Sequence, residues 1–171
     1  PGYATSIALV SQSGATLLGV VYDPVEGNLF EVVKGAPPTL NGCALPERDT
    51  ETAGGGRPTL FADRSLRNYP QFPHYEALFE IRFVGGAVLN ALQLLTEPNS
   101  VYLKAPKKPL GGCAIWDLAA VSLMVSESGG RSRTYSGARL HLNRPESIFF
   151  NDTGFVFASQ DVDFESLLQR L

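Results

Sequence analysis

One stretch in the second half of the chain decides the fold: IWDLAAVSLMVSESGG, residues 115–130. Its apolar side chains form a wide stripe at helical spacing, so we expect a buried helix over about 116–128 that ends at Gly129 and Gly130. Asp117 falls in the first turn of this helix, where free backbone N–H groups and the helix dipole stabilise a carboxylate. A second interpretation is that Asp117, anchored by Trp116, binds a hard cation such as Mg²⁺, which prefers oxygen ligands.

The N-terminal quarter of the sequence predicts β-strands. Residues 4–10 and 17–22 are short apolar runs separated by a polar turn with a glycine, which predicts a hairpin. The break at 23–27, DPVEG, is followed by a β-branched and aromatic run over 28–34. Three successive strands joined by tight turns make an antiparallel meander.

The remaining chain alternates between strands and helices. Residues 41–58 are rich in Gly, Pro and acidic residues, so we expect a loop there. This divides the chain into antiparallel strands over 1–45, a loop over 46–58 and an α/β part over 59–171. In that last part we expect helices covering a sheet. The expected strands are 59–62, 81–84, 101–104, 131–135 and 155–159, and the expected helices are 74–79, 87–95, 116–128 and 161–171.

Composition excludes several classes of protein. The chain has 171 residues, with 14 Lys and Arg against 17 Asp and Glu and a net charge of −3, which disfavours binding to nucleic acid. Cys43 and Cys113 are far apart and form no zinc or disulfide pattern, so a reducing, cytoplasmic setting is expected. No apolar run approaches the roughly 20 residues that cross a bilayer, and no membrane partner is expected.

The motifs along the chain carry a resemblance. The residues IWDLAA at 115–120, followed by ESGG at 127–130, resemble the Trp-Asp-x-Ala-Ala(Gly) and Glu-Ala-Gly-Gly signature of the inositol monophosphatase superfamily. Four earlier segments are similar to strands of that family in the same order, namely GVVYDP at 19–24, NLF at 28–30, KGA at 34–36 and LNG at 40–42. Agreement of several motifs in order and spacing is more specific than one short pattern.

This resemblance implies a fold and an activity. The implied fold is α+β, the C-terminal portion of the layered α/β/α/β/α sugar phosphatase fold, with mixed sheets covered by helices. The implied activity is a Mg²⁺-dependent phosphomonoesterase, in which Asp117 is a metal ligand. The implied substrate contacts include the turn formed by Gly85, Gly86 and Ala87, where N–H groups at a helix start meet the substrate. A plain tight turn is the alternative interpretation of the two glycines.

Within the superfamily, the segment YLKAPKK at 102–108 looks most like the 3'(2'),5'-bisphosphate nucleotidase branch. No acidic residue lies in 109–112, where the inositol-specific branch usually has one. Lys104, Lys107 and Lys108 suit a substrate with more than one phosphate, such as 3'-phosphoadenosine 5'-phosphate, which would lose its 3'-phosphate. A solvated basic turn is an equally good interpretation of these lysines.

The family's remaining metal ligands precede the strand at 19–22 in sequence, and this chain begins after them. We therefore expect the chain to be a truncated part that is inactive alone. The segment DPVEG at 23–27 imitates a metal-binding motif, but ordinary turn chemistry explains it better. Two alternatives remain: an inositol or sugar-phosphate phosphatase, and a non-catalytic binding or assembly fragment, with a homodimer as a possible state.

Overall fold

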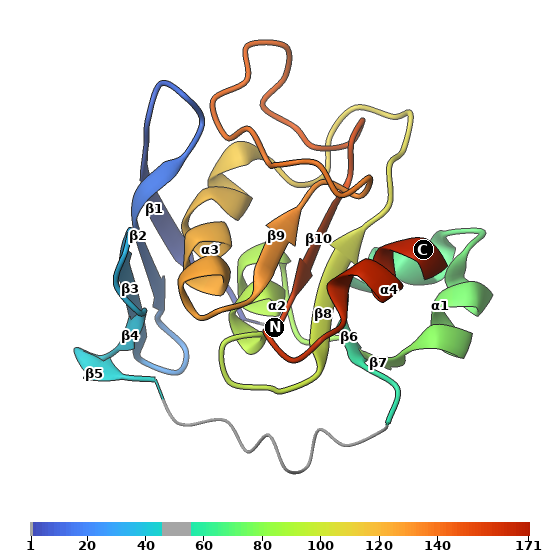
Figure 1. Ribbon diagram of the computed structural model, residues 1–171, viewed down its shortest axis with the longest axis horizontal. Coiled ribbons are helices and arrows are strands. Elements are labelled where there is room, and N and C mark those ends of the chain that lie inside the picture. The colour runs from blue at the N-terminus through green and yellow to red at the C-terminus, as the bar shows by residue number, and fades with distance from the viewer. Residues whose placement is uncertain (1, 46–55) are drawn as a thin grey trace.

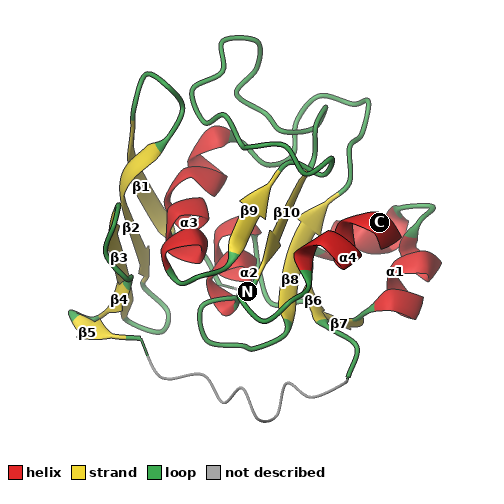
Figure 2. Ribbon diagram, viewed as in Figure 1, coloured by secondary structure: helices red, strands yellow, loops and turns green. Residues whose placement is uncertain are grey.

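The structure, a computed structural model, describes residues 2–45 and 56–171. Its elements lie in four layers in the order sheet, helices, sheet, helices (Figure 1, Figure 2). This is the α+β arrangement expected from the sequence, with helices covering a mixed sheet. The expected five-layer order has a further helical layer, and no helix of the described residues covers the outer face of the first sheet.

The first sheet is an antiparallel meander in which each strand pairs with the next one in sequence. The predicted hairpin and third strand are confirmed, and Gly14 takes the positive φ of 75° that the first turn requires. In the next turn, Asp23 Oδ1 accepts hydrogen bonds from the N–H groups of Val25 and Glu26, as ordinary turn chemistry predicts. The strands are β1 (Thr5–Val10), β2 (Thr16–Asp23), β3 (Asn28–Val33), β4 (Thr39–Leu40) and β5 (Cys43–Ala44).

The hairpin of β4 and β5 was not expected, since 41–58 was predicted to be a loop. Asn41 and Gly42 occupy its two-residue turn with φ of 52° and 75°, and Leu40 pairs with Cys43. Positive φ at both central residues is typical of the type I′ turn, whose twist matches that of the flanking strands. Asn-Gly is the strongest sequence signal for this turn. Positions 46–55 of the predicted loop lie outside the described residues. The division into 1–45, 46–58 and 59–171 stays a prediction.

The second sheet is mixed. Its strand order is β7 (Glu80–Arg82), β6 (Thr59–Phe61), β8 (Ser100–Lys104), β10 (Phe155–Ala158) and β9 (Arg131–Arg133). Strand β6 runs parallel to both of its neighbours, whereas β10 is antiparallel to β8 and β9. The three parallel strands therefore end at the same edge of the sheet.

Helices α2 (Ala87–Gln93) and α3 (Ile115–Glu127) lie between the two sheets, and α1 (Phe72–Leu78) and α4 (Phe164–Arg170) lie beyond the second sheet (Figure 1). Helix α4 begins later than the predicted residue 161, because the side chain of Asp163 accepts a hydrogen bond from the Ser166 N–H and caps it there. The short 3₁₀ helix η2 (Arg64–Asn68) was not predicted.

Two apolar clusters form the core. One joins the inner face of the first sheet, α2, α3 and one face of the second sheet, and the other joins the opposite face of the second sheet to α1 and α4. Because α3 is enclosed by two sheets, its residues 118–125 are all buried. Trp116 is different: it was expected to be a packed anchor, but 57% of it is exposed, so that expectation was wrong. In the described part of the chain, no helix is long and apolar enough to span a bilayer.

Candidate functional site

A cleft of about 490 Å³ opens where the parallel strands of the second sheet end. Asp63 follows β6, the turn 83–87 follows β7, and Lys104 is the last residue of β8, so all three strands contribute to its wall. Ligands of open α/β sheets bind outside the carboxyl ends of the strands, which makes this position informative. The far wall comes from Gly112, Cys113 and Asp117 at the start of α3.

A buried amide and an ion pair together join the three strand ends. Asn90 is 0% exposed, and its Nδ2 donates to Asp63 Oδ1 at 2.9 Å and to the Gly85 carbonyl at 3.0 Å. Its Oδ1 accepts from the Gly85 N–H at 3.3 Å. The other oxygen of Asp63 forms an ion pair with Lys104 Nζ. The turn after β7 is thereby fixed relative to the ends of β6 and β8.

The electrostatics of Lys104 follow from its neighbours. Burial alone would favour the neutral amine, but the nearby Cys113 sulfur and the Asp63 carboxylate outweigh it, so the pKa of Lys104 is raised and the side chain is a cation. Burial raises the pKa of Cys113 despite the opposing effect of Lys104. A thiol that stays protonated is a poor nucleophile, so cysteine chemistry is not favoured here.

Asp117 lies in the first turn of α3 and lines the cleft. Its Oδ2 accepts a hydrogen bond from the Ala114 N–H at 2.8 Å, which is the structural role that its position predicts. Within the described residues its Oδ1 has no hydrogen-bond partner. One carboxylate oxygen therefore orients the side chain, and the other remains available to a ligand in the cleft.

The start of α3 is held by a loop. The Ile115 N–H donates to the Ile148 carbonyl at 2.8 Å, and the Phe150 N–H donates to the Cys113 carbonyl at 3.0 Å. Arg144 keeps this loop in place, since its guanidinium contacts the carbonyls of Ser147 and Phe149, both oxygens of Asp152 and the ring of Phe150. The backbone leading to Asp117 is fixed from outside the helix.

A complete magnesium site does not fit these residues. In the ranges 2–45 and 56–171, no group of three or more His, Cys, Asp or Glu side chains is placed to hold a metal ion. The other carboxylate of the cleft, Asp63, is already bonded to Lys104 and Asn90. Hard divalent cations take about six oxygen ligands, and the described part of the cleft offers one unpaired carboxylate oxygen, that of Asp117.

Of the residues singled out from the sequence, the structure brings five to the cleft: Gly85, Gly86, Ala87, Lys104 and Asp117. Lys107 and Lys108 are not part of its lining. Lys107 lies beside Gly112 and exchanges backbone and amide hydrogen bonds with Asn151, and Lys108 is exposed. For these two lysines the solvated-turn interpretation describes their position better.

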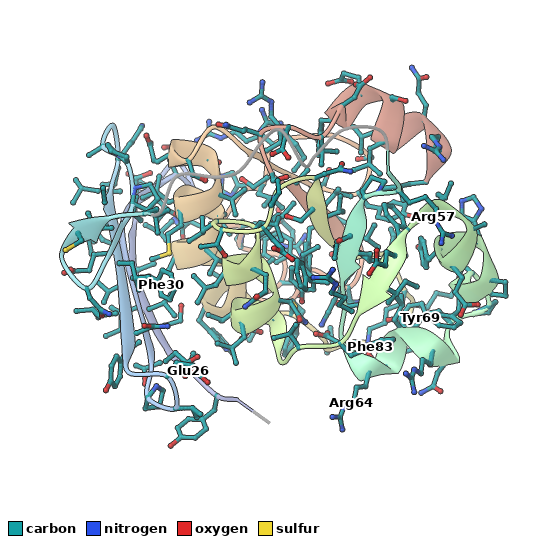
Figure 3. All side chains as sticks on the ribbon, turned by 90° about the horizontal axis from the view of Figure 1, so that it is seen from below. Glu26, Phe30, Arg57, Arg64, Tyr69 and Phe83 are labelled. Atoms are coloured by element: carbon teal, nitrogen blue, oxygen red, sulfur yellow. The ribbon has the colours of Figure 1, made fainter. Side chains whose placement is uncertain are left out.

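Sequence reasoning missed four residues that shape the cleft, namely Asp63, Arg64, Asn90 and Cys113. Asp63 and Arg64 had a signal, because they directly follow the apolar run 59–62, and residues just after a parallel strand gather at its carboxyl end. Figure 3 shows Arg64 extending outward from the surface, so it stands at the rim. Asn90 and Cys113 lie in apolar stretches without any local signal.

Cleft and layers together define a class: an α+β protein with a polar, ligand-accessible cleft at the carboxyl ends of parallel strands. The model of the inositol monophosphatase family matches residues 1–170, and the chain belongs to this family. The match runs through nearly the whole chain.

Individual relatives agree with this assignment. Nus factor SuhB of Pasteurella multocida is 30% identical over 148 residues, covering 83% of this chain and 53% of that protein. The structure of inositol monophosphatase from Anabaena (Nostoc) sp. PCC 7120 superposes with a TM-score of 0.74 at 21% identity, covering 98% of this chain and 65% of that one. The structure of SaIMPase-II, described with 2'AMP bound, superposes with a TM-score of 0.70 at 18% identity. The superposition covers 93% of this chain and 57% of that one. The chain thus spans about half the length of the curated SuhB relative.

Proposed function

We propose that this chain forms part of a magnesium-dependent phosphomonoesterase that acts on a small phosphorylated substrate. One observation carries the proposal: the free oxygen of Asp117 and the turn 85–87 at the start of α2 line the same cleft. The first N–H groups of a helix have no partner within it and attract anions, and a carboxylate oxygen attracts the hard cation that neutralises a phosphate. Membership of the family agrees with this chemistry.

For the substrate we favour a nucleotide bisphosphate that loses its 3'-phosphate over an inositol phosphate. Lys104 and Arg64 place two cations at the cleft, and no carboxylate lies in 109–112. Lys104 is already ion-paired with Asp63, so Arg64 is the more available cation for a second phosphate. The description of SaIMPase-II with 2'AMP is compatible with a phosphorylated nucleotide in this fold. The SuhB name of the sequence relative favours no particular substrate.

The 171-residue chain is expected to bind substrate weakly and to turn none over, because Asp117 alone cannot fix a cation where in-line displacement needs it. The binding test follows backbone amide NMR signals during titration with adenosine 3',5'-bisphosphate or inositol 1-phosphate, with and without Mg²⁺. We expect the signals of Gly85, Gly86 and Ala87 to shift, more strongly with the nucleotide.

Asp117→Asn should remove the Mg²⁺-dependent part of the shift, whereas Asp163→Asn, which removes one charge outside the cleft lining, should not. Absence of any shift at 85–87 with either ligand would contradict the proposed site. Mg²⁺-dependent phosphate release by the purified chain would contradict its inactivity while leaving the site intact.

A second candidate, an assembly fragment, is favoured by the outer face of the first sheet. Leu9, Leu18 and Val33 are cross-strand neighbours there, and they are 58%, 37% and 55% exposed. An apolar row of this kind fits a second copy of the chain, buried face to face. Light scattering should then give a dimer for the chain and a monomer for Leu18→Lys. A monomeric parent chain at high concentration would rule this candidate out.

A further inference from the structure

A second recess lies away from the cleft and shares none of its lining residues. It has a volume of about 220 Å³ and is bounded by the β1–β2 turn, the residue after β3, the C-terminal half of α3, β9 and the segment 139–142. In Figure 1 these elements lie together where the first sheet, α3 and β9 meet. We call this recess the basic groove, after its charges.

Three cations and one carboxylate line the basic groove: Lys34, Arg133, Arg139 and Glu127. Arg133 and Arg139 oppose each other directly across an isolated antiparallel bridge. Like charges directly opposite on paired strands destabilise the pairing, so this arrangement costs free energy unless an anion compensates it. Among the described residues, none of these three cations forms an ion pair. In a chain of net charge −3, this is a local surplus of positive charge.

Hydroxyl groups complete the lining. Ser132 Oγ donates to the Ser122 carbonyl at 3.3 Å and lies 3.0 Å from Ser126 Oγ. Ser132 is buried, whereas Ser126 is exposed and can turn its hydroxyl toward a bound group. Arg133 donates one N–H to the carbonyl of Ser132. This hydrogen bond limits the movement of the Arg133 guanidinium and leaves its other N–H donors available to a ligand.

We propose that the basic groove is a second anion site, which binds a phosphate-type dianion through Arg133, Arg139 and Lys34. Guanidinium forks match the oxygens of phosphate in geometry and charge, and the exposed Lys34 adds a point charge. Glu127 and the negative end of the α3 dipole also border the groove and oppose the binding of an anion. Three cations against one carboxylate leave a net positive charge for the phosphate, and the Ser126 hydroxyl is a further donor.

The test titrates the labelled 171-residue chain with inorganic phosphate at constant ionic strength and follows backbone amide NMR signals. We expect saturable shifts at Gly14, Ser126 and Ser132. Lys34→Gln combined with Arg139→Gln should weaken phosphate binding at these signals by about tenfold or more, because two charge-assisted contacts are lost. Arg131→Gln combined with Lys108→Gln is the matched control, since it replaces one Arg and one Lys, removes the same two charges and lines no part of the groove.

Each outcome decides the proposal. Phosphate shifts confined to residues 85–87 would place the anion in the cleft only and overturn the second site. Equal weakening by the two double variants would show that only the loss of net charge matters and would also overturn the second site. Inorganic phosphate is compared with glycerol phosphate and with vesicles carrying phosphatidic acid. Binding of both soluble ligands marks a site for a small phosphate group, and binding of the vesicles alone would contradict it. Thermal unfolding of each variant confirms that the fold is intact.

Discussion

At the scale of single residues, the cleft depends on how its polar groups are paired. Asp117 uses one oxygen to cap α3 and keeps the other free, so the structural and the ligand-binding interpretations of this residue describe two atoms of one side chain. Lys104 lies in the cleft because it ends a buried parallel strand, whereas Lys107 and Lys108 belong to the loop that follows it. The three lysines are close in sequence, but only Lys104 belongs to the strand and lines the cleft.

Asn90→Ala should destabilise the chain by about 2–3 kcal/mol, because it leaves Asp63 and the Gly85 backbone without their buried partner. Urea unfolding followed by circular dichroism measures the change. Gln93→Ala is the control on the same helix, since its side chain makes one long hydrogen bond of 3.4 Å, and we expect a change within about 0.5 kcal/mol. Equal effects of the two substitutions would show that Asn90 has no special role.

At the scale of elements, α3 and β2 approach each other closely at Gly19. A Cβ atom built on Gly19 would lie 2.9 Å from the Cα atom of Ala120, and Thr16 Oγ1 donates to the Ala119 carbonyl at 2.9 Å nearby. The absence of a side chain at residue 19 lets the first sheet pack directly on the helix backbone. This contact sets the distance between the first sheet and the helical layer.

Gly19→Ala should therefore destabilise the chain by about 1–3 kcal/mol, since the added methyl group must push backbone apart. The matched control is Gly56→Ala, where nothing lies within 4 Å of the added atom and the φ angle is not in the left-handed region. Chemical denaturation compares the two variants. A Gly19→Ala chain as stable as the Gly56→Ala chain would mean that α3 can shift away from β2 at little cost.

At the scale of the whole molecule, one apolar cluster spans both sheets. Helices α2 and α3 contribute to it together with Val21 and Phe30 of the first sheet and Tyr102 and Phe157 of the second. A shared core of this kind couples the two sheets, so we expect them to unfold in one cooperative transition.

Met124→Ala tests this coupling, because Met124 is 0% exposed within α3. We expect a loss of about 2–5 kcal/mol and a single transition that coincides in far-UV and near-UV circular dichroism, the latter reporting buried Tyr75 and Tyr102. Leu110→Ala, at a residue 75% exposed, should change stability by less than about 0.5 kcal/mol. Two separated transitions would show that the regions before and after the 46–58 segment fold independently.

The sequence by itself determined the α+β class and the described helices and strands other than β4, β5 and η2. Helical spacing over 115–130, strand runs separated by Asp-Pro and Gly turns, and the succession of motifs all act over short distances along the chain, where local sterics and burial preferences decide. Asn41-Gly42 also carries a local signal for the β4–β5 hairpin. The tertiary structure decided which polar groups share the cleft. Asp63, Lys104 and Asp117 come from three separate segments, and only the parallel pairing of β6 with its neighbours and the packing of α3 between two sheets bring them together. The opposed pair Arg133 and Arg139 depends likewise on a bridge between separate segments, so only the folded chain shows that the two charges meet.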